Sequence, residues 1–219
     1  MKEIRLKLPV TPEDLAKLEA GMIVYLDGPI YTGREGLYRR VLDEGLRPPV
    51  DLASVSNVNF HCSPAAAVRP DGSYDVGAVT ATASFRFSKW MSRWFDVSGC
   101  RMVIGKGGMS EEDYRNHFVP KGAVYLTTVG YGTGALLGRG IKKVRAVHWL
   151  EELGIAQAMW VFEVENFGPF LVDGDLMGNS LFEIENRKVN EKLADAYKGL
   201  KEPALRRYGE TTSRKDEVI

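Results

Sequence analysis

The chain has no net charge, few cysteines and no long apolar run. Its 219 residues include 29 Lys and Arg against 29 Asp and Glu, so no broad field would draw DNA, RNA or an anionic membrane to its surface. No apolar run reaches the length of a membrane span, and the first residues alternate charged and apolar side chains, unlike a signal peptide. Two cysteines, Cys62 and Cys100, are too few for an iron–sulfur cluster and are expected to be reduced. We therefore expect a cytoplasmic protein with no metal site, nucleic-acid partner or membrane partner of its own.

Strand and helix patterns interleave along the chain, which indicates an α/β domain with a mixed sheet. Strands are predicted at residues 22–26, 58–62, 76–82, 101–104, 123–129, 144–150 and 159–165, the last with one face half exposed. Helices are predicted after the capping sequences at Thr11 and Ser110, at residues 35–44 and 88–95, and at about 186–200. Asp27 to Pro29 is expected to be a turn, and residues 170–182 a hairpin that adds a small β layer. One domain over residues 1–200 and a charged, flexible tail over residues 201–219 complete the prediction.

Three basic residues follow apolar stretches and sit in turns of small residues. Arg34 ends the segment from Gly28, Arg86 ends the segment from Thr82, and Lys106 lies between glycines. Glycine and hydroxyl residues beside a cation allow close backbone approach and supply donors for a carboxylate or phosphate. Arg34 also precedes a predicted helix, whose N-terminal dipole favours an anion. The pattern predicts a local cationic pocket for a small, multiply charged anion.

Two glycine segments suggest nucleotide binding, and each has a simpler explanation. The turn from Gly105 to Gly108 lacks the spacing and the hydroxyl residue of a Walker A loop. The segment from Gly130 to Ala135 matches the dinucleotide pattern G-x-G-x-x-A, although its helix is short and no second half follows. The alternative is that these glycines let a helix pack closely on the sheet.

The three histidines are scattered, without the spacing of metal ligands. A lone histidine is usually structural. His61, beside Cys62 and near the predicted pocket, is kept as a further site candidate.

Five segments together resemble the β subunit of two-subunit class I fumarases and tartrate dehydratases. They are Gly28–Glu35, His61–Pro64, Thr82–Arg86, Ile104–Gly107 and Gly134–Val144. The resemblance covers about residues 5–185. It implies a three-layer β/β/α swivelling domain and an enzyme that reversibly hydrates a C4 dicarboxylate, fumarate to malate first and tartrate dehydration second. It also implies a separate α subunit, assembled with this chain into a heterotetramer, that holds a [4Fe-4S] cluster with one open iron for the substrate hydroxyl.

The same resemblance assigns roles to residues of this chain. Arg34 and Arg86 would bind the two substrate carboxylates, and Lys106 would hold a carboxylate or hydroxyl as a point charge. Thr82 would take part in proton transfer, together with Lys106 as a catalytic residue. Other expected substrate contacts are Ser84, Gly105 and Gly107.

Four positions depart from the family pattern and leave the substrate open. Glu35 and Tyr38 stand where the family has Asp and His, and Tyr38 is a further site candidate for that reason. Ala83 and Phe87 also differ, and Phe87 adds bulk beside Arg86. Two alternatives remain: a dinucleotide-binding oxidoreductase domain, and a non-catalytic regulatory paralogue of the hydro-lyase subunit.

Overall fold

The computed structural model describes residues 2–130, 132–196 and 198–199. Contacts divide the chain into two compact units, Met1–Glu183 and Ile184–Ile219. The charged tail predicted over residues 201–219 lies outside the described residues, and the single domain over residues 1–200 stays a prediction. None of the described helices is long and apolar enough to cross a membrane.

The main sheet of the first unit is mixed, which confirms the α/β prediction. Its strand order is β1-β2-β3-β6-β7-β9-β8, and β4 with β5 forms a separate two-stranded sheet. The strands are β1 (Glu3–Lys7), β2 (Ile23–Thr32), β3 (Val58–Phe60), β4 (Cys62–Val68), β5 (Tyr74–Ala81), β6 (Met102–Gly105), β7 (Val124–Thr128), β8 (Ile141–His148) and β9 (Met159–Gly174). Strands β1, β2, β3, β6 and β7 pair in parallel, whereas β9 runs antiparallel to β2, β7 and β8. Because β2 pairs with both β3 and β9, the strands β2-β3-β6-β7-β9 close into a ring.

Helices and helical turns connect these strands. The α-helices are α1 (Pro12–Leu15), α2 (Glu35–Tyr38), α3 (Leu52–Val55), α4 (Ser88–Ser98), α5 (Glu111–Asp113), α6 (Thr133–Gly140), α7 (Leu150–Leu153) and α8 (Leu181–Ala196). Two π-helical turns, η1 (Arg39–Asp43) and η3 (Tyr114–Phe118), and two 3-10 turns, η2 (Phe85–Phe87) and η4 (Val119–Lys121), extend or lead into them. The capping boxes predicted at Thr11 and Ser110 are both present.

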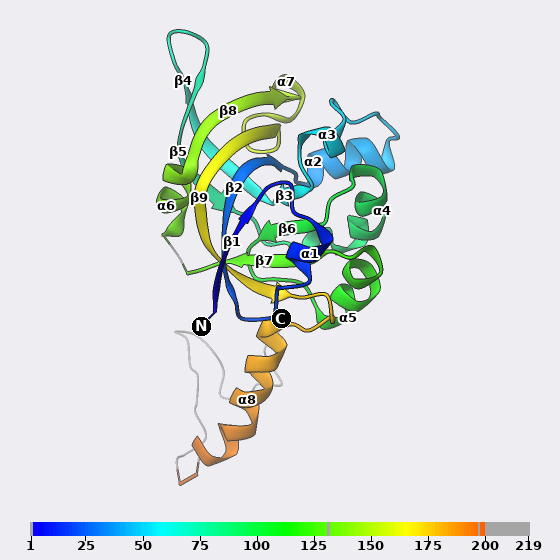
Figure 1. Cartoon of the computed structure of the whole chain (residues 1–219), viewed down its shortest axis with the longest axis vertical. Coiled ribbons are helices and arrows are strands. Elements are labelled where there is room, and N and C mark those ends of the chain that lie inside the picture. Colours follow the sequence, from blue (N-terminus) through cyan, green and yellow to red (C-terminus); the bar gives the residue numbers. More distant parts are fainter. Residues whose placement is uncertain (1, 131, 197, 200–219) are drawn as a thin grey trace, which may run out of the picture. The chain divides into compact units, whose positions relative to one another are not determined.

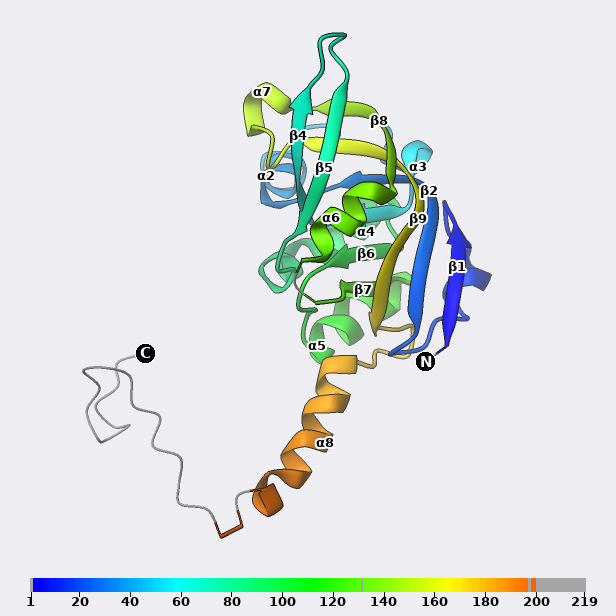
Figure 2. The ribbon, with the colours of Figure 1, turned by 90° about the vertical axis from the view of Figure 1, so that its left-hand side faces the viewer.

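Two hydrophobic cores make the first unit a layered structure. Helices α2 to α5 gather on one side of the sheet, and the β4–β5 hairpin with α6 lies on the other (Figure 1). One core joins the sheet to the hairpin through Val79 and Ala81, and the other joins it to the helices through Trp90 and Trp94. Figure 2 shows the hairpin and α6 in front of the sheet. Helix α6 packs closely on β5 at Gly134, where a Cβ would lie 2.8 Å from the Val79 carbonyl oxygen. Glycine at this position therefore permits the close packing that the alternative explanation of the glycine segment predicts.

The turn predicted at Asp27 to Pro29 is wrong, because β2 continues to Thr32. Gly28 and Pro29 stay in the ladder with β9, opposite Val164 and Glu163. Gly28 has a φ of +126° and interrupts the register without ending the strand. A local turn signal was therefore outweighed by pairing with a distant strand.

The strand predicted at residues 159–165 is present within β9, but its half-exposed face and the hairpin predicted for residues 170–182 are wrong. β9 is one strand of 16 residues, buried over most of its length, because its two faces pack into different cores: Trp160, Phe162 and Val164 lie in one, and Met159 and Val161 in the other. The second β layer comes from β4 and β5, not from residues 170–182. There, only an isolated bridge joins Gly174 to Ser180.

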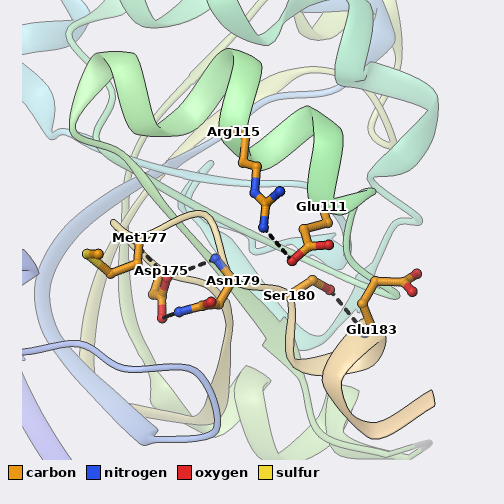
Figure 3. Close-up of polar contacts among 7 residues, drawn as sticks. All are labelled: Glu111, Arg115, Asp175, Met177, Asn179, Ser180 and Glu183. Atoms are coloured by element: carbon orange, nitrogen blue, oxygen red, sulfur yellow. Dashed lines mark hydrogen bonds and ion pairs between the residues drawn. The ribbon is translucent and has the colours of Figure 1, made fainter. Parts of the chain in front are cut away.

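A tight turn after β9 replaces the predicted hairpin (Figure 3). The Asp175 carboxylate accepts hydrogen bonds from the backbone N–H groups of Met177 (2.9 Å) and Asn179 (3.1 Å) and from the Asn179 side chain (2.8 Å). This turn lies at the edge where β7 begins, since Tyr125 of β7 pairs with Gly174.

Candidate functional site

The predicted pocket residues meet at the edge of the sheet where the parallel strands end. In β2, β3 and β6, Thr32 is paired with Phe60 and Phe60 with Ile104. Carboxyl ends of parallel strands share one edge and commonly form binding sites there. His61 and Lys106 directly follow the ends of β3 and β6, and Arg34 lies two residues after the end of β2.

The segment that begins at Thr82 joins this edge through backbone hydrogen bonds. Ala83 forms a parallel bridge with Lys106. The Thr82 N–H donates to the His61 carbonyl (2.6 Å), and the Lys106 N–H donates to the Thr82 carbonyl (3.1 Å). Three segments distant in sequence, at His61, Thr82 and Lys106, are thereby placed side by side.

Arg34 is half-buried at the N-terminus of α2, and backbone and side-chain oxygens hold it. Its Nη1 donates to the Ser63 hydroxyl and to the Ala156 carbonyl, the latter at 2.8 Å. Its Nε is buried without a hydrogen-bond partner among the described residues. Burial, followed by the positive charge of Arg86, lowers the pKa of the Arg34 guanidinium. The two cations are thus within electrostatic reach of each other, an arrangement that a bound anion would relieve.

Arg86 and Lys106 are exposed at this edge. Neither forms an ion pair with any residue that the structure describes. The Arg86 guanidinium lies over the Phe87 ring, 5.4 Å from its centroid, within cation–π range. Phe87 therefore lies beside the arginine, as predicted, and its buried ring packs against the guanidinium.

A hollow of about 260 Å³ opens beside Lys106. Strand β5 and the start of α6 line it, with Thr80, Thr128 and Thr133 among the lining residues. It has room for a small carboxylate ligand. The dinucleotide alternative is not favoured here, because β8, which follows α6, pairs with β9 and not with β7 in the described residues. The parallel βαβ unit that this alternative requires is absent from them.

His61 and Tyr38 are fully buried and belong to the interior behind the site. The two rings of the His61–Tyr38 pair are joined by a 2.6 Å hydrogen bond between Tyr38 Oη and His61 Nε2. His61 Nδ1 is 2.7 Å from the Ser84 hydroxyl, which also accepts a hydrogen bond from Tyr125 at 2.8 Å. Burial, assisted by the positive charge of Arg34, lowers the pKa of His61 to about 3.

The depressed pKa of His61 predicts a loss of stability in mild acid. The unfolded ring has a pKa of 6.5 and binds a proton below that value, whereas the folded ring stays neutral down to about 3. The stabilisation is therefore complete above pH 6.5 and declines as the pH falls towards 3. Between pH 7 and pH 5 the free energy of unfolding should fall by about 2 kcal/mol through this group. Urea unfolding of the wild type and of His61→Gln at both pH values measures it; equal losses in the two proteins would contradict the assignment.

The remaining predicted contacts divide into buried and exposed positions. Gly107 is exposed with a φ of +77° that favours glycine. Gly105 and Ser84 are buried, and the Ser84 hydroxyl is occupied by His61 and Tyr125. Direct substrate contact by these three stays a prediction.

Sequence reasoning missed several residues that hold the site. Ser63, the Ala156 carbonyl, Asn59 and Tyr125 all bond to predicted site residues or to their partners. A polar Asn59 inside an apolar strand was the available signal, since a buried amide needs hydrogen-bond partners. For Ser63, Ala156 and Tyr125 no local pattern marked the role.

The described residues do not fit an iron–sulfur cluster. They contain no group of three or more His, Cys, Asp or Glu side chains able to hold a metal ion. Cys62 and Cys100 are buried and free, and burial raises the pKa of both thiols, that of Cys100 to about 11. Both sulfurs are therefore held as thiols, whereas metal ligation requires thiolates.

Comparison with known proteins identifies the family of the chain. The family model described as the fumarase C-terminus matches residues 1–185. The chain belongs to this family. The resemblance noted from the five sequence segments is thus confirmed.

Three similar proteins extend the comparison. A Methanocaldococcus jannaschii protein, provisionally named as L(+)-tartrate dehydratase subunit beta, is 35% identical over 84% of this chain and 93% of its own length. L(+)-tartrate dehydratase subunit beta of Escherichia coli K12 is 31% identical over 89% of this chain and 93% of its own length. A Geobacillus stearothermophilus protein, provisionally named as class I fumarate hydratase, is 34% identical over 92% of this chain but only 37% of its own length. The region equivalent to this chain is therefore one part of a longer polypeptide in that relative.

Proposed function

We propose that this chain is the cluster-free subunit of an iron–sulfur hydro-lyase that reversibly hydrates a C4 dicarboxylate. Fumarate and malate are the first substrate pair and tartrate the second. The observation behind the proposal is the meeting of Arg34, Thr82 and Lys106 at one edge of the sheet in a member of the fumarase C-terminus family.

The partner in this proposal is an α subunit that carries the [4Fe-4S] cluster. Relatives named as β subunits support a multi-subunit enzyme, and the longer Geobacillus relative has the equivalent region within one chain. We propose a heterotetramer that acts in the cytoplasm.

The chemistry follows from the charges and hydroxyls of this chain. Arg34 and Arg86 bind the two carboxylates through charge-assisted hydrogen bonds, and Lys106 holds a carboxylate or hydroxyl. Thr82 moves the proton at the substrate carbon. Its hydroxyl is a poor base by itself, so the neighbouring cations must lower its pKa. Ser84, Gly105 and Gly107 complete the binding surface.

Anaerobic purification of the tagged chain from its native cell tests this function. We expect a co-purifying partner with about four irons and hydration or dehydration activity on fumarate, malate or tartrate. Arg86→Ala should reduce kcat/KM by about 10²-fold or more, because a bound carboxylate loses its paired charge. Arg69→Ala, an exposed arginine of the β4–β5 hairpin, is the matched control and should retain activity.

Each other outcome rejects part of the proposal. A cluster-bearing partner without activity on these acids would indicate a regulatory paralogue. The absence of both partner and iron would return the dinucleotide hypothesis to first place, with NAD or NADP protection against thermal unfolding as its test.

A further inference from the structure

Five polar side chains form a continuous hydrogen-bonded chain inside the protein. They come from β3, α2, the ends of β3 and β5, and β7, and each has an exposed fraction of 0%. In order they are Asn59, Tyr38, His61, Ser84 and Tyr125. Burying polar groups is costly unless they are hydrogen-bonded, so a connected chain of this kind fixes the positions of its members. At its Asn59 end, the amide Oδ1 is buried without a hydrogen-bond partner among the described residues.

The donors and acceptors give the chain a direction. The Asn59 amide donates to Tyr38 Oη, so the one Tyr38 proton is directed to His61 Nε2. A neutral ring that accepts at Nε2 bears its proton on Nδ1, and this proton is donated to Ser84 Oγ. The Ser84 proton in turn points to the Thr82 carbonyl, 3.4 Å away.

His61 and Ser84, in the middle of this hydrogen-bonded chain, are also bonded to the two segments that carry the proposed catalytic groups. The Ser84 N–H donates to the Lys106 carbonyl (3.2 Å), and the Thr82 N–H donates to the His61 carbonyl (2.6 Å). His61 therefore contacts the Thr82 segment through two hydrogen bonds, one at its backbone carbonyl and one between its ring and the Ser84 hydroxyl. Ser84 then ties that segment to the turn of Lys106.

We propose that His61, with Tyr38 and Ser84, is a positioning residue that holds Thr82 and Lys106 in register for proton transfer and exchanges no proton itself. This inference rests on the proposed function, because it assigns what the chain positions. It also explains why a tyrosine at position 38 is compatible with activity: its hydroxyl supplies the proton that sets the His61 tautomer.

The surroundings of His61 keep it neutral across the working pH range. Tyr38 from α2 and Ser84 contact its two nitrogens, Phe87 packs edge-on against its ring at 4.9 Å, and the charge of Arg34 acts on it from the start of α2. Burial and that charge lower the pKa of His61. A base or acid role would require a ring that titrates near neutral pH.

The test compares Tyr38→Phe and Ser84→Ala with the wild type in the complete enzyme. Both variants break the chain without removing a proposed substrate-binding charge. In Tyr38→Phe we expect kcat to fall about 10-fold with KM within about two-fold and the pKa values of the pH–rate profile unchanged. Ser84→Ala also removes a hydroxyl of the proposed binding surface, so for this variant the test is the fall in kcat alone. Tyr31→Phe is the matched control: Tyr31 is equally buried, its hydroxyl is not a member of this hydrogen-bonded chain, and kcat should be retained.

An NMR measurement on the full chain provides a readout that needs no activity. With ¹⁵N-labelled histidine, His61 should give a neutral ring protonated at Nδ1 that does not titrate between pH 5 and pH 8. His61→Gln assigns its signals among the three histidines, and Tyr38→Phe should alter its tautomer balance.

These two measurements separate the possible failures. Unchanged kcat in both variants, or an Nε2-protonated or titrating His61, would overturn the positioning proposal. Loss of a limb of the pH–rate profile in His61→Gln would make His61 an acid or base instead. A wild-type enzyme that is inactive on all three acids would reject the proposed function. The NMR result would then test by itself whether His61 is a neutral, Nδ1-protonated member of the hydrogen-bonded chain.

Discussion

Thr82→Val should lower kcat of the assembled enzyme by about 10²- to 10⁴-fold, the usual contribution of a positioned proton-transfer group. Valine has the shape of threonine but lacks the hydroxyl. Thr82 is 8% exposed at the sheet edge, and its known hydrogen bonds to His61 and Lys106 use the backbone. The substitution therefore removes the reacting group and leaves the segment in place, so KM should change little.

The control for this experiment is Thr82→Ser, which keeps the hydroxyl and should retain most of the activity. Steady-state kinetics with fumarate and malate, together with exchange of the carbon-bound proton with solvent, measures the effect. Equal kcat values for wild type and Thr82→Val would remove Thr82 from proton transfer. A large increase in KM with kcat preserved would make it a binding residue.

Gly105→Ala should destabilise the chain by about 3 kcal/mol, through overpacking and loss of the buried hydrogen bonds at Ser84. A Cβ at this position would overlap the Ser84 hydroxyl and lie 2.6 Å from the Tyr125 hydroxyl. Both neighbours are fully buried and bonded to each other, so neither can move without breaking the hydrogen-bonded chain that runs through His61. Glycine at position 105 is thus required by the interior behind the site.

Gly77→Ala in β5 is the matched control, because its Cβ would meet no atom within 4 Å. Its free energy of unfolding should stay within about 0.5 kcal/mol of wild type. Urea unfolding followed by tryptophan fluorescence measures both variants. Equal stability of the two variants would show that the packing at Ser84 relaxes around a methyl group.

Much of the local structure was readable in the chain. The capping boxes at Thr11 and Ser110 and the buried face of α4 follow from short-range chemistry, because their partners are a few residues away. The three basic turns were likewise visible, since each places a cation within a few residues of the end of a strand.

The long strands were less accessible to sequence reasoning. Gly28 and Pro29 look like a turn, yet their pairing with β9 keeps them in a strand. β9 looked half exposed, and is buried because its two faces pack into the two cores. Such outcomes depend on elements distant in sequence, which no local pattern specifies.

Residue types and spacing determined the mixed α/β fold class and predicted a small cationic site within it. Folding decided the roles of the polar groups behind it. In sequence, His61, Tyr38 and Ser84 each look like a group for a substrate. In the fold, segments 23 residues apart meet in the interior, and these groups bond to one another. Hydrogen-bond partners are chosen by the packing of distant segments, and a buried polar group must take the partner that packing provides.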